Sequence, residues 1–392
     1  MARALPVKQK RDSVRRLDNQ TQAYAWGSVT AIPELLGLAP TGAPQAELWI
    51  GAHPLAPSRL DGRSLDVLLA ERPDALLGAT SVARFGPRLP FLLKVLAAAQ
   101  PLSLQAHPSR AQAQAGFARE NAAGVPLTAP HRTYKDDNHK PELICALTPF
   151  RALCGFRALD ATRALLSTLR VERLTPLLAM LDTGLAGFFR QVMTLSRAEA
   201  AALVTDVAHA CATRPVRGFE AECTNAVGLA RAYPGDVGVI GALLLNLVEL
   251  APGEALALGA GNLHAYLEGT GIELMANSDN VLRGGLTPKH VDVAELVHVL
   301  DFSSGPAPIV RPLGQPEAVY PTTFPDFRLS RVDVRGPLQL QRLGADVVLC
   351  TAGSVEVNGL TLTRGAAGFA GFDEGPLVCT GEGTLYRATV NA

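Results

Sequence analysis

Alternating apolar and polar positions mark both ends of the chain and predict short β-strands. The alternation, or a short apolar run, is clear in AELWIGAHP (46–54) and LPFLLKVL (89–96), and again in FRLSRVDV (327–334) and SVEVNGLTLT (354–363). Side chains on a strand alternate between its two faces, so such segments fit half-buried strands. Short strands separated by Gly-rich turns are typical of an antiparallel sandwich or barrel.

The middle of the chain has a different texture and predicts helices. Residues 158–232 are rich in Ala, Leu and Arg, and Leu165, Leu166 and Leu169 fall on one helical face. Ser196 followed by Glu199 fits a capping box that opens the next helix. The segment GRSLDVLLAERPDALLG (62–78) predicts one further short helix, ended by Pro and Gly.

The order β, then α, then β predicts a helical block inserted into a β architecture. We expect residues 1–157 and 233–320 to form two parts of one β domain, which also holds the functional site. Residues 158–232 would be the inserted helical domain, and residues 321–392 a C-terminal β domain. The fold class is therefore mainly β with inserted α.

Composition narrows the classes of protein to which the chain belongs. Of 392 residues 48% are hydrophobic, which is ample for large cores. Lys+Arg and Asp+Glu both number 36, so the formal net charge of zero gives no general attraction to nucleic acid or to anionic membranes. No apolar run of ~18 residues is present, so we expect no membrane span and neither a membrane nor a nucleic acid as partner.

Two further features favour a cytoplasmic location. The basic start MARALPVKQKRDSVRR is not followed by an apolar stretch, so it does not resemble a secretory signal. The six cysteines are scattered and never stand at CxxC spacing, which favours reduced thiols.

The segment LSLQAHPS (102–109) carries the first candidate chemistry. We expect it to be a strand, in which Ser103, Gln105 and His107 share one face while the leucines share the other. Because a very apolar segment precedes it, that polar face meets either water or a ligand that binds a hydroxyl, an amide oxygen and an imidazole.

Gln105 and His107, two positions apart, can both point at one metal ion. Further ligands from β segments complete the set: His264 in the Gly-rich turn GAGNLHAYL, and Glu142, which opens an apolar strand just after Pro141. Two imidazole nitrogens and two oxygens suit Zn²⁺, while Fe²⁺, Mn²⁺ or Co²⁺ are alternatives. For each histidine, a hydrogen-bonded role in the core or at the surface is the alternative interpretation.

The other histidines in similar contexts are weaker candidates. His53 in GAHP resembles the QAHP segment, but Gly51 stands where a second ligand would be, so we expect a structural role. His139 lies in the charged stretch YKDDNHKPE and is expected to be solvated or at the rim of a site.

The polar loop MANSDNVLRGGLTPKH (275–290) is a candidate phosphate site. Arg283 and Lys289 lie close to two glycines, and Arg forms bidentate hydrogen bonds while Lys supplies a point charge. An ordinary solvated turn is the alternative.

At these residues the chain resembles type I phosphomannose isomerases, zinc enzymes built of cupin domains. The matching segments run from residue 23 to about 293: AYAWGS, AELWIGAHP, PFLLKVLAAAQPLSLQAHPS, GFARENAAGVPL, YKDDNHKPELICALTPFRALCGFR, YPGDVGVIGALLLNLVELAPGEALAL, HAYLEG and IELMANSDNVLRGGLTPKHVDV. The helical block matches loosely, and the C-terminal part only in texture. The resemblance implies cupin (jelly-roll) β-barrel domains plus a helical domain.

The resemblance also implies an activity and its residues. Gln105, His107, Glu142 and His264 fall on the family's four zinc-ligand positions, and Arg283 falls on its essential arginine. The implied reaction interconverts mannose 6-phosphate and fructose 6-phosphate with one Zn²⁺ per chain. A small-molecule sugar phosphate is the implied partner, and we expect a monomer.

Further polar positions of the family's site are occupied in this sequence. Lys140 and Asp279 are candidates for proton transfer, with no ranking between them, while Ser103, Lys94 and Lys289 are candidates for substrate binding. The turn GAGNLH departs from the segment that many relatives carry, yet it leaves His264 in place.

Two other functions remain as alternatives. A different metal-dependent cupin enzyme, such as an oxygenase, usually uses three histidines and a carboxylate or two histidines and one carboxylate. The amide of Gln105 argues against that set. A non-catalytic sugar-sensing cupin has no need of the metal ligands or of Arg283, and all of these are present here.

Overall fold

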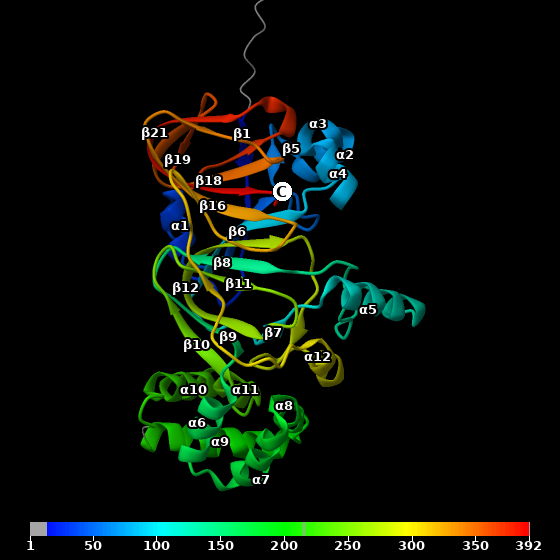
Figure 1. Cartoon of the computed structure of the whole chain (residues 1–392), viewed down its shortest axis with the longest axis vertical. Coiled ribbons are helices and arrows are strands. Elements are labelled where there is room, and N and C mark those ends of the chain that lie inside the picture. The colour runs from blue at the N-terminus through cyan, green and yellow to red at the C-terminus, as the bar shows by residue number, and fades with distance from the viewer. Residues whose placement is uncertain (1–13, 215, 392) are drawn as a thin grey trace, which may run out of the picture. The chain divides into compact units, whose positions relative to one another are not determined.

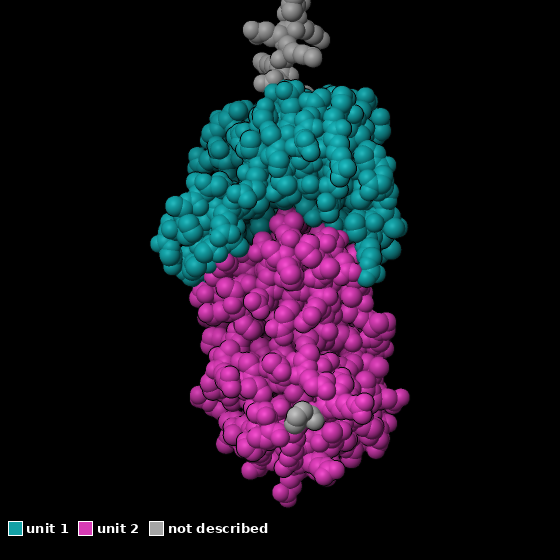
Figure 2. All heavy atoms as spheres, turned by 90° about the vertical axis from the view of Figure 1, so that its left-hand side faces the viewer, with its two compact units in different colours: residues 1–24, 29–95, 311–392 teal, residues 25–28, 96–310 magenta. Residues whose placement is uncertain are grey.

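The computed structural model describes residues 14–214 and 216–391 (Figure 1). Residues 1–13, which carry most of the basic N-terminal segment, lie outside the described residues. The chain divides into two compact units (Figure 2), one of residues 1–24, 29–95 and 311–392 and one of residues 25–28 and 96–310. In the part of the chain that the structure describes, no helix has the length and apolar character needed to span a membrane.

The first unit contains an antiparallel sheet in the strand order β15-β16-β21-β18-β20-β1-β4-β5, with β17 on β21 and β19 on β18. Its first strand lies against a strand from near the C-terminus, because Val14 to Leu17 pair with Ala370 to Ala367. The strands of this sheet are β1 (Val14–Asp18), β4 (Arg59–Leu60), β5 (Arg63–Ser64), β15 (Glu317–Val319), β16 (Arg328–Arg335), β17 (Leu338–Leu340), β18 (Asp346–Val357), β19 (Leu360–Thr363), β20 (Ala367–Ala370) and β21 (Leu377–Thr389).

Short helices and two further strands complete the first unit. They are β2 (Gln20–Gln22), paired with β3 (Glu47–Gly51), and α1 (Ala31–Leu36), α2 (Leu65–Glu71), α3 (Pro73–Leu77) and α4 (Ala79–Phe85). The single helix predicted over 62–78 is two helices. Proline disfavours the helical conformation of the residue before it, and Arg72 accordingly leaves that conformation with φ −138° and ψ 55° before Pro73 opens α3.

The second unit is built around β12 (His264–Ala276), which bonds to several antiparallel neighbours. Its first half pairs with β9 and β7, and its second half pairs with β8, with a register shift between Tyr266 and Glu268. The other strands of this unit are β7 (Gln105–Ala106), β8 (Glu142–Ala146), β9 (Phe150–Phe156), β10 (Leu245–Leu250), β11 (Ala255–Leu258), β13 (Leu282–Arg283) and β14 (Ile309–Val310). The boundary between the two units falls inside β6 (Phe91–Ala98).

The helices of the second unit include the predicted helical block, which Figure 1 shows gathered at one end of this unit. They are α5 (Arg110–Ala122), α6 (Leu159–Thr168), α7 (Thr175–Leu178), α8 (Leu185–Met193), α9 (Arg197–Thr213), α10 (Glu220–Ala232), α11 (Gly238–Leu243) and α12 (Val293–Val299). Leu165, Leu166 and Leu169 are fully buried, as the helical spacing predicts. The capping box of Ser196 and Glu199 at the start of α9 is confirmed.

The expected fold class of antiparallel β with inserted helices is confirmed, with two corrections. Among the described residues, the strand order of the first unit runs from one edge to another, so that sheet does not close into a barrel. The segment 102–109 is not a full strand, since only Gln105 and Ala106 form β7. Leu104 bonds to Gly285 and Gly284 through its backbone, and such isolated bonds hold an extended segment without a continuous ladder.

The two units group the chain differently from the four predicted ranges. Residues 29–95 belong with residues 311–392, whereas the helical block belongs with the strands of the second unit. The finer division into four ranges stays a prediction.

Candidate metal centre

Three buried side chains converge in the second unit. Nε2 of His107 lies 3.3 Å from Oε1 of Glu142, and Nε2 of His264 lies 3.3 Å from Oε2 of the same carboxylate. One nitrogen or oxygen atom from each of the three lies within 4.8 Å of the others. All three residues are at most 4% exposed. Two imidazoles around one carboxylate, shielded from water, form a donor set that suits a divalent transition metal.

Two strands and the residue that directly follows a third bring these groups together, since His107 comes just after β7. Glu142 is the first residue of β8, where the backbone pairs it with Leu258 on one side and Met275 on the other. His264 is the first residue of β12, and the backbone register places it opposite Gln105 on β7. Gln105 is therefore next to the cluster in the sheet, as a fourth ligand requires.

The Gly-rich turn before His264 has a steric reason. Gly261 has φ +75°, and a Cβ there would stand 2.8 Å from both the backbone N of Asp301 and the carbonyl oxygen of Val299. The backbone N–H of Gly261 also donates to the carbonyl of His107 at 2.8 Å. Only glycine fits this left-handed, closely packed position, so the turn ties the two histidine segments together.

Backbone carbonyls orient both imidazole rings. Nδ1 of His107 lies 2.7 Å from the carbonyl oxygen of Asn280, and Nδ1 of His264 lies 3.0 Å from that of Asn262. A carbonyl only accepts hydrogen bonds, so each Nδ1 carries the proton and each Nε2 presents its lone pair to the cluster. Nε2 of His107 is buried and has no hydrogen-bond partner among the described residues. An orphaned buried nitrogen of this kind fits a metal ligand.

The electrostatics of the cluster keep it in the form that a metal requires. Burial alone would raise the pKa of Glu142, but the charges of His107 and Lys140 lower it well below its usual range. Burial lowers the pKa of His107 from its ordinary value of 6.5, although Glu142 opposes this effect. At neutral pH the carboxylate is ionised and this imidazole is neutral, which are the states that bind metal.

Lys140 stands beside the cluster. Its ammonium lies 3.4 Å from Oε1 of Glu142, and its side chain is 11% exposed. The carboxylate of Glu142 therefore contacts both the histidines and a primary amine.

Arg283 is also brought to this edge of the second unit. It belongs to β13, and its backbone pairs with Gln105. Its guanidinium is half-buried and makes no hydrogen bond or ion pair with the residues that the structure describes. Burial lowers the pKa of Arg283, and burial together with the charge of Arg283 lowers the pKa of Lys289. A half-buried guanidinium with a second cation nearby is suited to bind an anion.

A small cavity of about 30 Å³ lies beside Arg283. Its wall is mainly polar and includes His131, Thr133 and His290, together with the charged residues Arg132 and Asp292. The structure thus places Arg283 at a polar recess in the same unit as the metal cluster.

The remaining predicted site residues are less closely defined. Ser103 is half-buried, and Asp279 is exposed, with its backbone N–H bonded to Asp136 at 2.8 Å. Lys94 belongs to the first unit, where its ammonium lies 3.6 Å from Glu47 and 5.3 Å from the ring centroid of Trp49.

His53 and His139, the weaker candidates, have neighbours outside the cluster. His53 is buried in the first unit and packs edge-on against Trp49 at 4.8 Å between ring centroids. Nε2 of His139 lies 2.7 Å from the guanidinium of Arg110. The six cysteines are buried and free, as expected for reduced thiols.

Sequence reasoning missed the polar network that supports the cluster. Asp136, Asn138, Ser278 and Asn280 join two loops through several hydrogen bonds. Their signal in the sequence is the pair of short polar runs YKDDN and NSDN, each next to an apolar strand. Near the first of these runs, only His139 was considered, as a solvated residue or one at the rim of a site.

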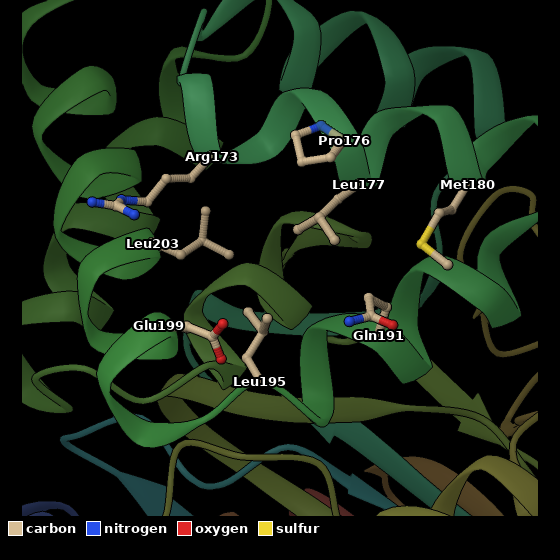
Figure 3. Close-up of a pocket in the computed structure, with 8 residues that line it drawn as sticks. All are labelled: Arg173, Pro176, Leu177, Met180, Gln191, Leu195, Glu199 and Leu203. Atoms are coloured by element: carbon tan, nitrogen blue, oxygen red, sulfur yellow. The ribbon is translucent and has the colours of Figure 1, made fainter.

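A larger pocket, of about 420 Å³, lies within the helical block (Figure 3). Leu177, Leu195 and Leu203 line it, together with charged residues that already have partners. Arg173 pairs with Asp206 at 2.9 Å, and Glu199 caps the start of α9. None of the predicted site residues lines this pocket.

The fold and the cluster define an antiparallel β protein with a buried His–Glu–His metal site, and comparisons with known proteins narrow that class. Residues 14–159 match the family model "Phosphomannose isomerase type I, catalytic domain". The mannose-6-phosphate isomerase of Escherichia coli (strain K12) is 38% identical over 396 residues, which cover 95% of this chain and 99% of the relative. The human mannose-6-phosphate isomerase is 32% identical over 407 residues, and the match covers 90% of this chain and 92% of the human protein.

Solved structures agree with the sequence comparisons. The mannose 6-phosphate isomerase of Salmonella typhimurium bound to fructose 6-phosphate and zinc superimposes with a TM-score of 0.90 at 38% identity. The match covers 97% of this chain and all of that one. This chain belongs to the type I phosphomannose isomerase family.

Proposed function

We propose that this protein interconverts mannose 6-phosphate and fructose 6-phosphate, with one zinc ion held by Gln105, His107, Glu142 and His264. The observation that carries the proposal is the convergence of two oriented imidazoles on one buried carboxylate. The family relationship supports the same reaction. The two alternatives, an oxygenase and a non-catalytic sugar sensor, are not favoured by the relatives described above.

The reaction moves a proton from C2 to C1 of the sugar through an enediol, so no redox cofactor is needed. The difficult step is the development of negative charge on the oxygen atoms next to the carbon that loses its proton. Bound zinc supplies Lewis-acid stabilisation of that charge. Glu142 and the two histidines would hold the ion, and the carbonyls bonded to Nδ1 orient the two imidazole rings.

Proton transfer falls to Lys140 or to Asp279. Lys140 is the better placed in the metal-free protein, because its ammonium is within 3.4 Å of the cluster. Asp279 is exposed and lies in the turn after β12, which ends at Ala276. A side chain that transfers this proton must lie within about 3 Å of it in the complex with substrate.

Arg283 and Lys289 are proposed to bind anionic groups of the substrate. A guanidinium has five donors and stays charged, so Arg283 stabilises either the developing enediolate or the phosphate. Lys289 supplies a second positive charge, and Ser103 and Lys94 are proposed as additional substrate contacts. We further propose that the protein acts as a cytoplasmic monomer whose only partner is the sugar phosphate.

A coupled assay tests this function. Fructose 6-phosphate formed from mannose 6-phosphate is measured for the purified protein, for the protein after chelation, and after zinc is restored. We expect activity that chelation abolishes and zinc restores. Glucose 6-phosphate serves as the control substrate. Undiminished turnover in the thoroughly chelated protein would remove the metal from the mechanism, and absence of turnover in the zinc-loaded protein would refute the isomerase itself.

A further inference from the structure

Asp136 is the centre of a hydrogen-bond network between two loops. Its Oδ1 accepts from the hydroxyl of Ser278 at 2.8 Å, from the backbone N–H of Asn138 at 2.9 Å and from the side-chain amide of Asn280 at 3.2 Å. Its Oδ2 accepts from the backbone N–H of Asp279 at 2.8 Å. Both oxygen atoms of one carboxylate are therefore used to hold the turn 277–280 against the loop 135–138.

Asn280 carries this network to the metal cluster. Its side chain is fully buried, donates to the carbonyls of Asp136 and Asn138 at 2.9 Å each, and accepts from the backbone N–H of Lys135 at 2.7 Å. Its own backbone carbonyl faces Nδ1 of His107 at 2.7 Å. The position of this carbonyl is thus fixed by the hydrogen bonds that the Asn280 side chain makes.

From this arrangement we infer that Asp136 is a positioning residue of the metal centre. It holds the turn 277–280 so that the Asn280 carbonyl fixes the ring and the tautomer of His107. The inference rests on the proposed metal site, but it does not depend on the identity of the sugar. Partners behind a ligating histidine commonly change metal affinity by about 10–100-fold when they are lost.

Asp136→Asn is the most informative substitution because it keeps the shape of the side chain. An amide has one oxygen and one NH₂ group, while all four neighbours of Asp136 donate hydrogen bonds. Whichever way the amide turns, its NH₂ group opposes at least one donor. We expect the zinc dissociation constant to rise about tenfold, at the lower end of the usual range because Asp136 acts through Asn280.

Asp236→Asn is a matched control within the same unit. Asp236 is also half-buried, and its two carboxylate oxygens also accept from backbone N–H groups, those of Gly238 at 2.7 Å and Thr287 at 3.0 Å. No described contact joins Asp236 to His107, Glu142 or His264. This variant should lose stability in a similar way, yet keep the zinc dissociation constant of the wild-type protein.

A second readout does not need metal. The Nδ1 proton of His107 in the metal-free protein should give a protected imidazole resonance in NMR spectra, assigned by its loss in His107→Gln. We expect that resonance to persist in Asp236→Asn and to broaden by exchange with water in Asp136→Asn. Ser278→Ala removes one hydrogen bond to Asp136, so the imidazole resonance should broaden less in this variant than in Asp136→Asn. If Asp136→Asn does not fold, Ser278→Ala takes its place in the test.

The outcomes separate the two proposals. If the wild-type protein binds no zinc, the proposed metal site fails, while the imidazole resonance still reports on Asp136. If the wild-type protein binds zinc, and Asp136→Asn or Ser278→Ala keeps both the wild-type dissociation constant and the protected resonance, the positioning role of Asp136 is refuted.

Discussion

The ammonium of Lys140 lies 3.4 Å from the carboxylate of Glu142. The two residues are separated only by Pro141, and Glu142 opens the strand β8. A positive charge is therefore part of the surroundings of the carboxylate that joins both histidines. Against the effect of burial, the charges of His107 and then of Lys140 lower the pKa of Glu142, and the charge of Lys140 also repels any cation that binds there.

Replacing Lys140 should therefore separate metal binding from catalysis. In Lys140→Met we expect kcat to fall by about 10²–10⁴, the usual contribution of a positioned acid or base. Zinc should be retained and bound somewhat more tightly, since a like charge has been removed. Steady-state kinetics and a zinc titration of the same preparation measure both effects. If Lys140→Met keeps the wild-type kcat, Lys140 does not transfer the proton, and another residue such as Asp279 does.

Arg283 should contribute through electrostatics and not through the metal. Its guanidinium cannot ligate zinc, so Arg283→Ala should fold and keep its zinc while kcat falls by about 10²–10³. Arg283→Lys is the matched variant that keeps the charge, and it should recover little activity because it lacks the bidentate fork. A loss of kcat at constant KM assigns Arg283 to the transition state, whereas a rise in KM alone assigns it to binding of the phosphate. Full activity of Arg283→Ala would contradict either role.

The helical block should affect stability without affecting the metal. Phe188 of α8 is fully buried, so Phe188→Ala should lower the free energy of unfolding by about 3–5 kcal/mol. The zinc dissociation constant should stay unchanged, because none of the proposed ligands belongs to residues 158–232. Denaturant unfolding and zinc titration test the two statements separately. A metal affinity that falls together with stability would show that the block supports the metal centre.

The stability of the metal-free protein should depend on pH through His107. Burial lowers the pKa of this histidine below its ordinary value of 6.5, so the unfolded chain binds its proton more readily than the folded protein does. The free energy of unfolding should therefore fall as the pH decreases from 6.5 through the lower folded pKa. Denaturant unfolding at pH 7 and at about pH 5 should show a smaller fall for His107→Gln than for the wild-type protein. Equal falls in the two proteins would contradict this assignment.

Glu142 should add a second loss of stability at lower pH. Burial would raise the pKa of this carboxyl, but its cationic neighbours lower it well below its ordinary value of 4.5. A depressed carboxyl pKa stabilises the folded protein above 4.5, and this contribution disappears as the pH falls through the folded value. In Glu142→Gln the acid-induced loss below 4.5 should be smaller, which an acid titration followed by circular dichroism would measure.

The sequence predicted the elements that have a strong local pattern. The stripe of Leu165, Leu166 and Leu169 and the capping box of Ser196 are local features, and the structure contains both. The alternating strands near the C-terminus form the sheet of β16, β18 and β21. These elements follow from periodicity and from hydrogen bonds between residues that are close in the chain.

The sequence could not predict features that depend on contacts between distant segments. The polar alternation from Leu102 onward predicted a strand, but only two residues find ladder partners there. The convergence of His107, Glu142 and His264 depends on the pairing of strands far apart in the chain, and periodicity alone left each histidine open to a structural role. Asp136 was missed because its function comes from the turn that it faces, more than 140 positions later.

The most direct test of the metal centre is X-ray diffraction from zinc-loaded crystals, measured on both sides of the zinc absorption edge. We expect one anomalous peak in the second unit, with atoms of Gln105, His107, Glu142 and His264 at about 2.0–2.3 Å from it. A peak that lacks any two of these side chains, or a zinc-loaded active enzyme with no peak at this position, would contradict the account.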